Sequence, residues 1–337
     1  MIPIIAMTLV LGASLASPPA AADEVDAFFK GRTITITSAG GAGGGYGIYA
    51  LLLSQHIGRH IPGNPNVIVS YMPGAGGVRA ANHAYNVAPK DGTAILAPLQ
   101  SLATLQLLGK KGLRYDAEKF HWLGRAVETT SGFLVKASVA RSLDELKARK
   151  SETIVGVTQP GAPNHIMAAL VSYCTGGKIR LVSGYKGSNG VAEAYRKSEV
   201  EAIAIPLSSL QLAHKELLAD TLVAQSGFER SPAFANVPLL FDICPAGEKH
   251  QIVEVFQAQE AMGRSYAVPP GVPASRVAAL RRAFDAAVSD PAFLSEAKKR
   301  NMAISPKSGP DMQTLVERHV RTESGLVERA KAAVGIK

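Results

Sequence analysis

Two glycine-rich segments are the part of this sequence best suited to chemistry, because they can present peptide N–H groups to a bound molecule. They are SAGGAGGGYG, residues 38–47, and MPGAGG, residues 72–77. Glycine reaches positive φ and lets the backbone approach a ligand without a Cβ in the way. Each segment follows a β-branched run and precedes a predicted helix, whose N-terminus carries partial positive charge. The two segments therefore predict a site for an anion.

Nucleotide chemistry is not favoured by the same segments. The first contains no G-x-G-x-x-G spacing, and no glycine precedes a Lys-Ser or Lys-Thr pair. His56 and His60 have a helical spacing that can bind zinc, but no third ligand accompanies them, so we interpret them as partners of a helix C-terminus. We expect no metal and no cofactor.

Two more loops precede helices further along the chain. One contains Pro160, Gly161, Asn164 and His165, and the other contains Tyr185 and Lys186. His165 could donate a hydrogen bond to an anion, or it could cap or pack its helix. Lys186 could pair with a carboxylate, although an exposed lysine is the commoner situation.

The elements around these loops alternate between strand and helix patterns. Strands are predicted at 33–37, 67–71, 93–99, 153–158, 179–182 and 201–205, and helices at 46–60, 78–87, 166–173, 191–196, 274–288 and 310–334. Such alternation indicates a mainly parallel sheet with ligands bound beyond the carboxyl ends of its strands. Gln100 and Ser101 follow the third strand, at such an end. Ser142 to Glu145 form a predicted capping box with a structural role.

Composition limits the function classes. The chain has 337 residues, with 36 Lys and Arg against 27 Asp and Glu, and a net charge of +9. This charge favours an acidic partner. The basic pairs are scattered and only 6% of residues are aromatic, which argues against nucleic acid. Residues 1–22 are apolar and uncharged and end in small residues, so we expect a signal peptide.

The two cysteines, Cys174 and Cys244, lie 70 positions apart in a chain expected to be exported. They lack the spacing and the neighbours of a metal or redox site. Two buried thiols and one disulfide are equally compatible with the sequence.

An ordered set of short motifs resembles the substrate-binding receptors of tripartite tricarboxylate transporters, often called Bug receptors. The set comprises the first glycine loop, PGAGG at 73–77, APKDG at 88–92, YKG at 185–187, the stretch from RSP at 230–232 to VP at 237–238, and VPPGVP at 268–273. The resemblance implies an α/β fold of the periplasmic binding protein type, with two lobes, two mainly parallel sheets flanked by helices, and a hinge of two crossing strands near 126–133 and 260–267. It implies a first lobe at 23–128, a second at 129–259, and a return at 260–337 whose last helix is a candidate to pack on the second lobe.

The resemblance also implies a function and a site. The chain would be a periplasmic, non-enzymatic receptor, expected to be a monomer, that captures a small organic acid between the lobes and delivers it to integral-membrane transporter subunits. Main-chain N–H groups would hold the carboxylate. The implied ligand-binding residues are Ser38, Ala39, Gly40, Gly41, Gly43, Tyr46, Pro73, Gly74, Ala75, Gly76, Gly77, Ser101, Pro160, Gly161, Asn164, His165, Tyr185 and Lys186. Many relatives have prolines in the first loop and an Asp soon after it, whereas this chain has Ala39, Ala42 and Tyr46, so the ligand stays open.

Two alternatives come from other classes. A periplasmic sensor would use the same cleft but dock on a signalling kinase. An exported hydrolase would need Ser188 or His165 as a catalytic group, but Ser188 misses the G-x-S-x-G pattern by one glycine position.

Overall fold

The structure is a computed structural model that describes residues 20–336. The predicted signal peptide therefore lies outside the described residues, apart from its last three positions, which begin the first helix. Among the residues described, no helix is both long and apolar enough to cross a membrane.

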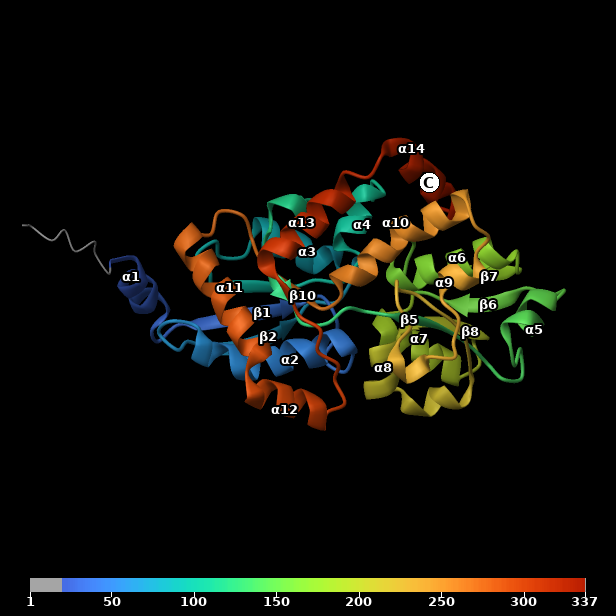
Figure 1. Cartoon of the computed structure of the whole chain (residues 1–337), viewed down its shortest axis with the longest axis horizontal. Helices are drawn as coiled ribbons and strands as arrows, with labels where there is room; N and C mark the ends of the chain where they lie inside the picture. Colours follow the sequence, from blue (N-terminus) through green and yellow to red (C-terminus); the bar gives the residue numbers. More distant parts are fainter. Residues whose placement is uncertain (1–19, 337) are drawn as a thin grey trace, which may run out of the picture.

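Two sheets, each covered by helices on both faces, make up two lobes that lie end to end (Figure 1). Lobe A is built on sheet A, with the strand order β11-β4-β10-β3-β1-β2. Its strands are β1 (Thr33–Ser38), β2 (Asn66–Tyr71), β3 (Ala94–Ala97), β4 (His121–Arg125), β10 (Ser265–Val268) and β11 (Lys307–Ser308). Its helices are α1 (Ala20–Phe29), α2 (Gly45–Ile57), α3 (Val78–Asn86), α4 (Leu102–Leu107), α11 (Ala274–Ser289), α12 (Pro291–Lys299) and α13 (Gly309–Val320).

Lobe B is built on sheet B, with the strand order β7-β6-β8-β5-β9. Its strands are β5 (Ser131–Val135), β6 (Thr153–Gly156), β7 (Ile179–Val182), β8 (Ala202–Pro206) and β9 (Thr221–Gln225). Its helices are α5 (Leu143–Ala148), α6 (Pro163–Thr175), α7 (Gly187–Arg196), α8 (Leu207–Ala213), α9 (Leu240–Ile243), α10 (Glu248–Met262) and α14 (Ser324–Ala333).

Alternation of buried side chains along the strands gives each sheet two separate cores. In β1, Ile34 and Ile36 point to the core shared with α2 and α11, whereas Leu96 of β3 points to the core under α3, α4 and α13. In β5, Phe133 faces α6 and α10, and Leu134 faces α7 and α8. This period of two is what a sheet covered on both faces requires.

The two-lobed α/β fold is confirmed, and most strands of each sheet run in one direction. Strands β1, β2 and β3 run parallel, as do β6, β7 and β8, but β4, β5, β9, β10 and β11 pair in the antiparallel sense. The strands that run against the others are β10 and β11 in sheet A and β5 in sheet B, and β5 and β10 each directly follow a connection between the lobes. Their direction follows from the path of the chain and not from their own residue pattern.

Three segments connect the lobes. Residues 126–130 join β4 to β5, and α10 leads through Gly263 and Arg264 into β10, so the second crossing is a helix end and not the expected strand. The two crossings are hydrogen-bonded to each other, from Ala126 N to Arg264 O and from Arg264 N to Val127 O, each 2.9 Å. Figure 1 shows α10 running from the junction of the lobes along lobe B towards α14.

The third connection, residues 321–323, interrupts the single helix expected at 310–334. The carboxylate of Glu323 accepts hydrogen bonds from the N–H groups of Gly325 and Leu326 and so begins a new helix, α14. Helix α13 packs on lobe A, and α14 packs on α10 and α6. Cys174 of α6 and Cys244 at the end of α9 form a disulfide in lobe B, which settles the alternative left open by the sequence.

Candidate functional site

The loops singled out in the sequence meet at the junction of the lobes. Three loops of lobe A follow the carboxyl ends of β1, β2 and β3, which run parallel and therefore end at one edge of sheet A. Lobe B lies against this edge. A Cβ on Gly43 would lie 3.2 Å from Nδ2 of Asn189, and a Cβ on Gly161 would lie 3.0 Å from Leu105. The glycines thus occupy positions where one lobe touches the other.

Close packing, and not an unusual φ, explains the glycines of the first loop. None of the glycines at 40–47, all of which the structure describes, has φ in the left-handed range. A Cβ on Gly47 would lie 2.3 Å from the carbonyl oxygen of Gly41, and one on Gly40 would lie 2.7 Å from Cβ of Tyr46. The side chain of Ser38 is buried and bonds with the backbone of Gly40, and Ala39 N donates to Ala97 O. These contacts fold the loop tightly over the end of β1.

Positive φ explains the second loop, as the sequence predicts. Gly74, Ala75, Gly76 and Gly77 have φ values of 135°, 48°, 63° and 90°. Four successive residues in this range turn the chain sharply after the exposed Pro73 and bring it to the first turn of α3. Gly76 is in contact with the side chain of Gln159 from lobe B, where even a Cβ would clash. The second loop therefore meets the opposite lobe at Gly76.

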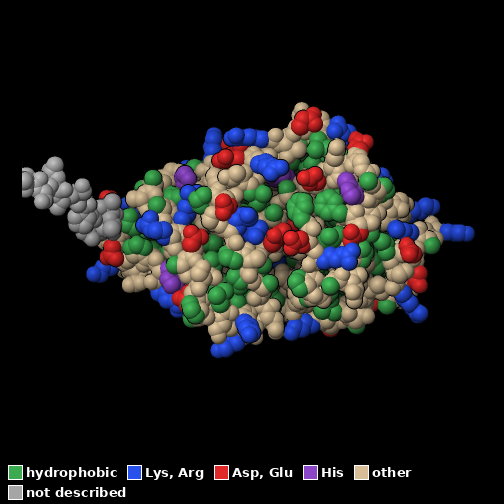
Figure 2. Space-filling model, viewed as in Figure 1, with side chains coloured by type: hydrophobic (Ala, Val, Ile, Leu, Met, Phe, Trp, Pro, Cys, Tyr) green, Lys and Arg blue, Asp and Glu red, His purple; other side chains and the backbone are tan. Residues whose placement is uncertain are grey.

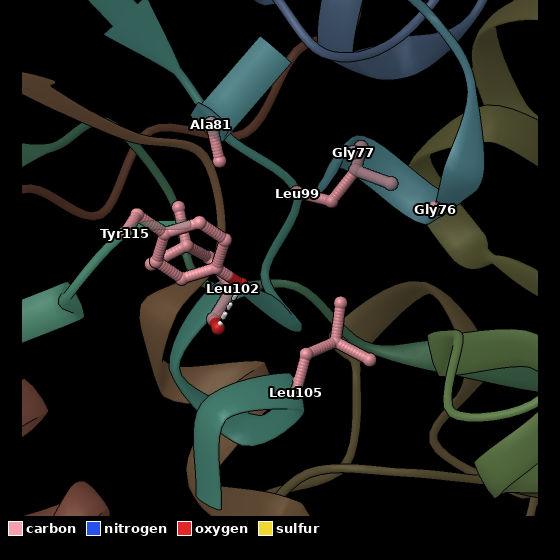
Figure 3. A pocket seen from close by; sticks show the side chains of 7 residues that line it. All are labelled: Gly76, Gly77, Ala81, Leu99, Leu102, Leu105 and Tyr115. Carbon is pink, nitrogen blue, oxygen red and sulfur yellow. Dashed lines mark hydrogen bonds between the residues drawn. The ribbon is translucent and has the colours of Figure 1, made fainter. Parts of the chain in front are cut away.

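An apolar pocket lies beneath the second loop (Figure 3). Its walls are formed by Gly76, Gly77, Ala81, Leu99, Leu102, Leu105 and Tyr115. The hydroxyl of Tyr115 donates to the carbonyl of Leu102 at 2.8 Å, which holds α4 against the pocket wall. The pocket is too narrow for a water molecule, so it supports the loop by packing.

Lobe B places its predicted residues in different surroundings. Pro160 is exposed, Gly161 has φ of 82°, and Oδ1 of Asn164 accepts hydrogen bonds from the N–H and the hydroxyl of Thr158. Asn164 therefore closes its loop onto the end of β6. Tyr185 is half-buried and Lys186 is exposed at the start of α7.

His165 is buried in the first turn of α6. Burial, and secondarily the charge of Lys110, lowers the pKa of its imidazole to about 4, so the ring is neutral at pH 7. Within residues 20–336 its Nδ1 has no hydrogen-bond partner, and neither has the buried Oγ of Ser101 or Nε2 of Gln159. Three buried polar groups near the lobe junction thus lack a partner among these residues.

A buried polar cluster at the hinge was missed by the sequence analysis. The hydroxyl of Tyr46 donates to Oε1 of Gln100 at 2.8 Å and accepts from its N–H at 3.2 Å. Arg264 stacks on the ring of Tyr46, and Glu260 lies one helical turn before Arg264. Burial raises the pKa of Glu260 to about 8 and also raises that of Tyr46. Gln100 stood at a predicted strand end, whereas Glu260 and Arg264 carried no motif.

The histidine pair at 56 and 60 belongs to a structural contact. Nε2 of His56 lies 2.6 Å from Glu296, and Nε2 of His60 lies 2.9 Å from Asp290, which also pairs with Arg59. These contacts hold α12 against α2. In the described part of the chain, no group of three His, Cys, Asp or Glu side chains is arranged to hold a metal ion.

Comparison with known proteins identifies the fold. No model of a known protein family matches the chain, and no curated protein matches it by sequence. Among solved structures, the periplasmic binding protein BugD is 17% identical, with a TM-score of 0.72 over 91% of this chain and 98% of its own. R. palustris Rpa4515, solved with adipate, is 20% identical, with a TM-score of 0.71 over 90% and 98%. MatC from Rhodopseudomonas palustris, with bound malate, is 16% identical, with a TM-score of 0.69 over 90% and 99%. The chain therefore has the two-lobed fold of the Bug-type periplasmic binding proteins.

Proposed function

We propose that this chain is an extracytoplasmic binding protein that captures a small organic carboxylate between its lobes and passes it to a tripartite tricarboxylate-type transporter in the membrane. The observation that carries the proposal is the meeting of the second loop with Gln159. A backbone turn at a helix N-terminus favours an anion, and the opposing amide nitrogen of Gln159 lacks a partner among residues 20–336.

The charge and the similar structures support the same class of ligand. The net charge of +9 attracts anions over distance, and Figure 2 shows Lys and Arg side chains interspersed with Asp and Glu over one face, without one continuous basic stripe there. Two of the similar structures were solved with dicarboxylates, adipate and malate. The neutral His165 and the N–H groups of 38–46 and 74–77 would then serve as donors to a carboxylate.

Binding would close the lobes around the ligand. The crossings at 126–130 and 263–264 are short and hydrogen-bonded to each other, so they can serve as a hinge. A ligand favours the closed state when only that state lets both lobes contact it. In this proposal the mature chain starts after residue 22, works as a monomer in the periplasm and catalyses no reaction.

A panel of organic acids tests the proposal directly. The mature protein is unfolded and refolded to remove any carried ligand, and its thermal unfolding is followed with succinate, malate, adipate, citrate and benzoate. A ligand at about 100 times its Kd adds roughly 2.7 kcal/mol to the free energy of unfolding. We expect at least one carboxylate to raise the melting temperature by several degrees. No shift with any acid would overturn the proposed ligand class.

A glycine substitution then places the site. Gly43→Val puts a side chain on the first loop facing Asn189, and we expect it to weaken binding because it wedges the lobes apart. Gly177→Val is the matched control, because a Cβ at each of the two glycines would meet one polar side-chain atom, at 3.1 Å for Gly177 and at 3.2 Å for Gly43. Gly177 lies before the amino end of β7, whereas the predicted ligand-binding loops follow the carboxyl ends of strands. Equal affinities for the two variants would place the ligand elsewhere.

A further inference from the structure

Arg264 is a fully buried arginine that lies between the lobes. It is 1% exposed and follows Gly263 on the second crossing. Its Nη2 donates to the hydroxyl of Ser208 in lobe B at 2.8 Å. Its Nε and Nη1 have no hydrogen-bond partner anywhere in residues 20–336. Burying a guanidinium while two of its nitrogens make no hydrogen bond costs free energy. We therefore expect a group outside the chain to bind these nitrogens.

The protein supplies no close counter-charge to this guanidinium. Within the described residues no carboxylate lies within 4 Å of Arg264. The nearest buried acid along the chain, Glu260, is largely protonated at neutral pH because burial raises its pKa to about 8. Arg125, the last residue of β4 before the first crossing, differs, since it donates to the carbonyls of Ala261 and Ser305 and lies 3.7 Å from Glu128. The buried charge of Arg264, which has no carboxylate close by, is therefore in a less favourable environment than that of Arg125.

The guanidinium is directed at the first glycine loop. A Cβ on Gly45 would lie 3.0 Å from Nη2 of Arg264 and 3.0 Å from Oγ of Ser209. The Cζ atom lies 3.7 Å from the centre of the Tyr46 ring. Gly45 and Tyr46 form the first turn of α2, whose N–H groups also attract an anion. A positive side chain, a helix N-terminus and two serine hydroxyls therefore converge at one point.

We propose that Arg264 is a ligand-binding residue, whose guanidinium takes a carboxylate oxygen of the organic anion held between the lobes. This rests on the proposed function, because it names the cation of the same site. Recognition would then combine main-chain N–H groups with one buried charge supplied by the hinge. Since the hinge residue itself contacts the anion, binding would be coupled directly to lobe closure.

Titration calorimetry with succinate, malate and adipate tests the assignment on four proteins: the wild type, Arg264→Gln, Arg264→Lys and Arg125→Gln. Losing a hydrogen bond to a charged group costs about 10- to 100-fold in affinity, which is the loss expected for Arg264→Gln. Arg264→Lys should retain part of the affinity, because it keeps the charge without the planar fork. Arg125→Gln should lower stability and leave affinity unchanged. Equal affinities of wild type and a folded Arg264→Gln would overturn the assignment alone, whereas a wild type that binds none of the acids would overturn the proposed function as well.

A measurement on the wild type keeps the test decisive where Arg264→Gln does not fold. The assigned Nε–Hε NMR signal of Arg264 is followed while the binding acid is added, with the Arg125 signal as the internal reference. We expect the Arg264 signal to move downfield and the Arg125 signal to stay. A stationary Arg264 signal at saturating ligand would exclude a direct contact.

Discussion

The guanidinium of Arg264 lies over the ring of Tyr46, 3.7 Å from its centre, and thereby joins the hinge to the first glycine loop. The hydroxyl of the same tyrosine is bonded to Gln100 at the end of the third parallel strand. A cation above an aromatic face is stabilised by the ring's electron density, more so when water is excluded. The side chain of Tyr46 thus connects the first glycine loop with the end of β3 and with the second crossing.

Tyr46→Phe should separate the two contacts of this tyrosine. It removes the hydrogen bonds to Oε1 and N–H of Gln100 but keeps the ring under Arg264. We expect a loss of about 1 to 2 kcal/mol in the free energy of unfolding in urea. Tyr71→Phe, at an exposed position on β2, is the control and should change little. Equal unfolding midpoints for the two variants would show that the Gln100 contact contributes nothing.

Gly263→Ala should disturb the hinge severely. Gly263 has φ of 44°, and a Cβ there would lie 2.0 Å from the carbonyl oxygen of Val127 on the other crossing. The matched control is Gly247→Ala at the other end of α10, where φ is 94°, ψ is similar, and no atom lies within 4 Å of the Cβ position. Backbone strain alone costs about 1 to 3 kcal/mol, which both variants should show. We expect Gly263→Ala to lose clearly more in chemical denaturation, and comparable losses would mean that the crossings move apart without cost.

The sequence predicts those features of the fold and of the candidate site that depend on neighbouring residues, and it does not predict those that depend on the path of the whole chain. The second loop was predictable, because positive φ at Gly74, Gly76 and Gly77 is a property of glycine itself. The direction of β5 and β10 was not, since it depends on where the chain crosses between lobes. The cluster of Tyr46, Gln100 and Arg264 combines residues up to 218 positions apart, so no short motif announces it. Its local signs were Tyr46 in the first glycine loop and Gln100 at a strand end.

The disulfide should stabilise lobe B and leave lobe A unaffected. Cys174 and Cys244 are both buried in the core formed with α6, α9 and α10, and they close a long stretch of lobe B. Removing such a cross-link typically costs about 2 to 4 kcal/mol, largely through the freedom regained by the unfolded chain. In differential scanning calorimetry, reduction or a Cys174→Ala, Cys244→Ala pair should lower one unfolding transition. A uniform decrease of every transition would mean that the lobes unfold as one unit.

Glu260 should make the ligand-free protein less stable as the pH rises from 6.5 to 8. Burial raises its pKa from 4.5 to about 8 in the folded chain, so in this window the folded state keeps a proton that the unfolded chain has released. Stability therefore falls with rising pH, by about 1 to 2 kcal/mol across the window. The charged groups that act on Glu260 are Arg264, which lowers its pKa, and Glu128, which raises it.

The window starts at 6.5 because buried histidines act in the opposite sense below it. Burial lowers the pKa of His165 and of His319 to about 4, so stability gains from them as pH rises through the ordinary histidine pKa of 6.5, and this gain fades above it as the histidines of the unfolded chain lose their protons. Urea denaturation of wild type and Glu260→Gln at pH 6.5, 7.2 and 8.0 isolates the carboxylate, with Glu254→Gln on the exposed face of α10 as the control. We expect Glu260→Gln alone to gain stability relative to wild type as the pH rises from 6.5 to 8.0. The same slope in all three proteins would show that Glu260 ionises in the hinge as it does in water, and that Arg264 has its counter-charge within the protein.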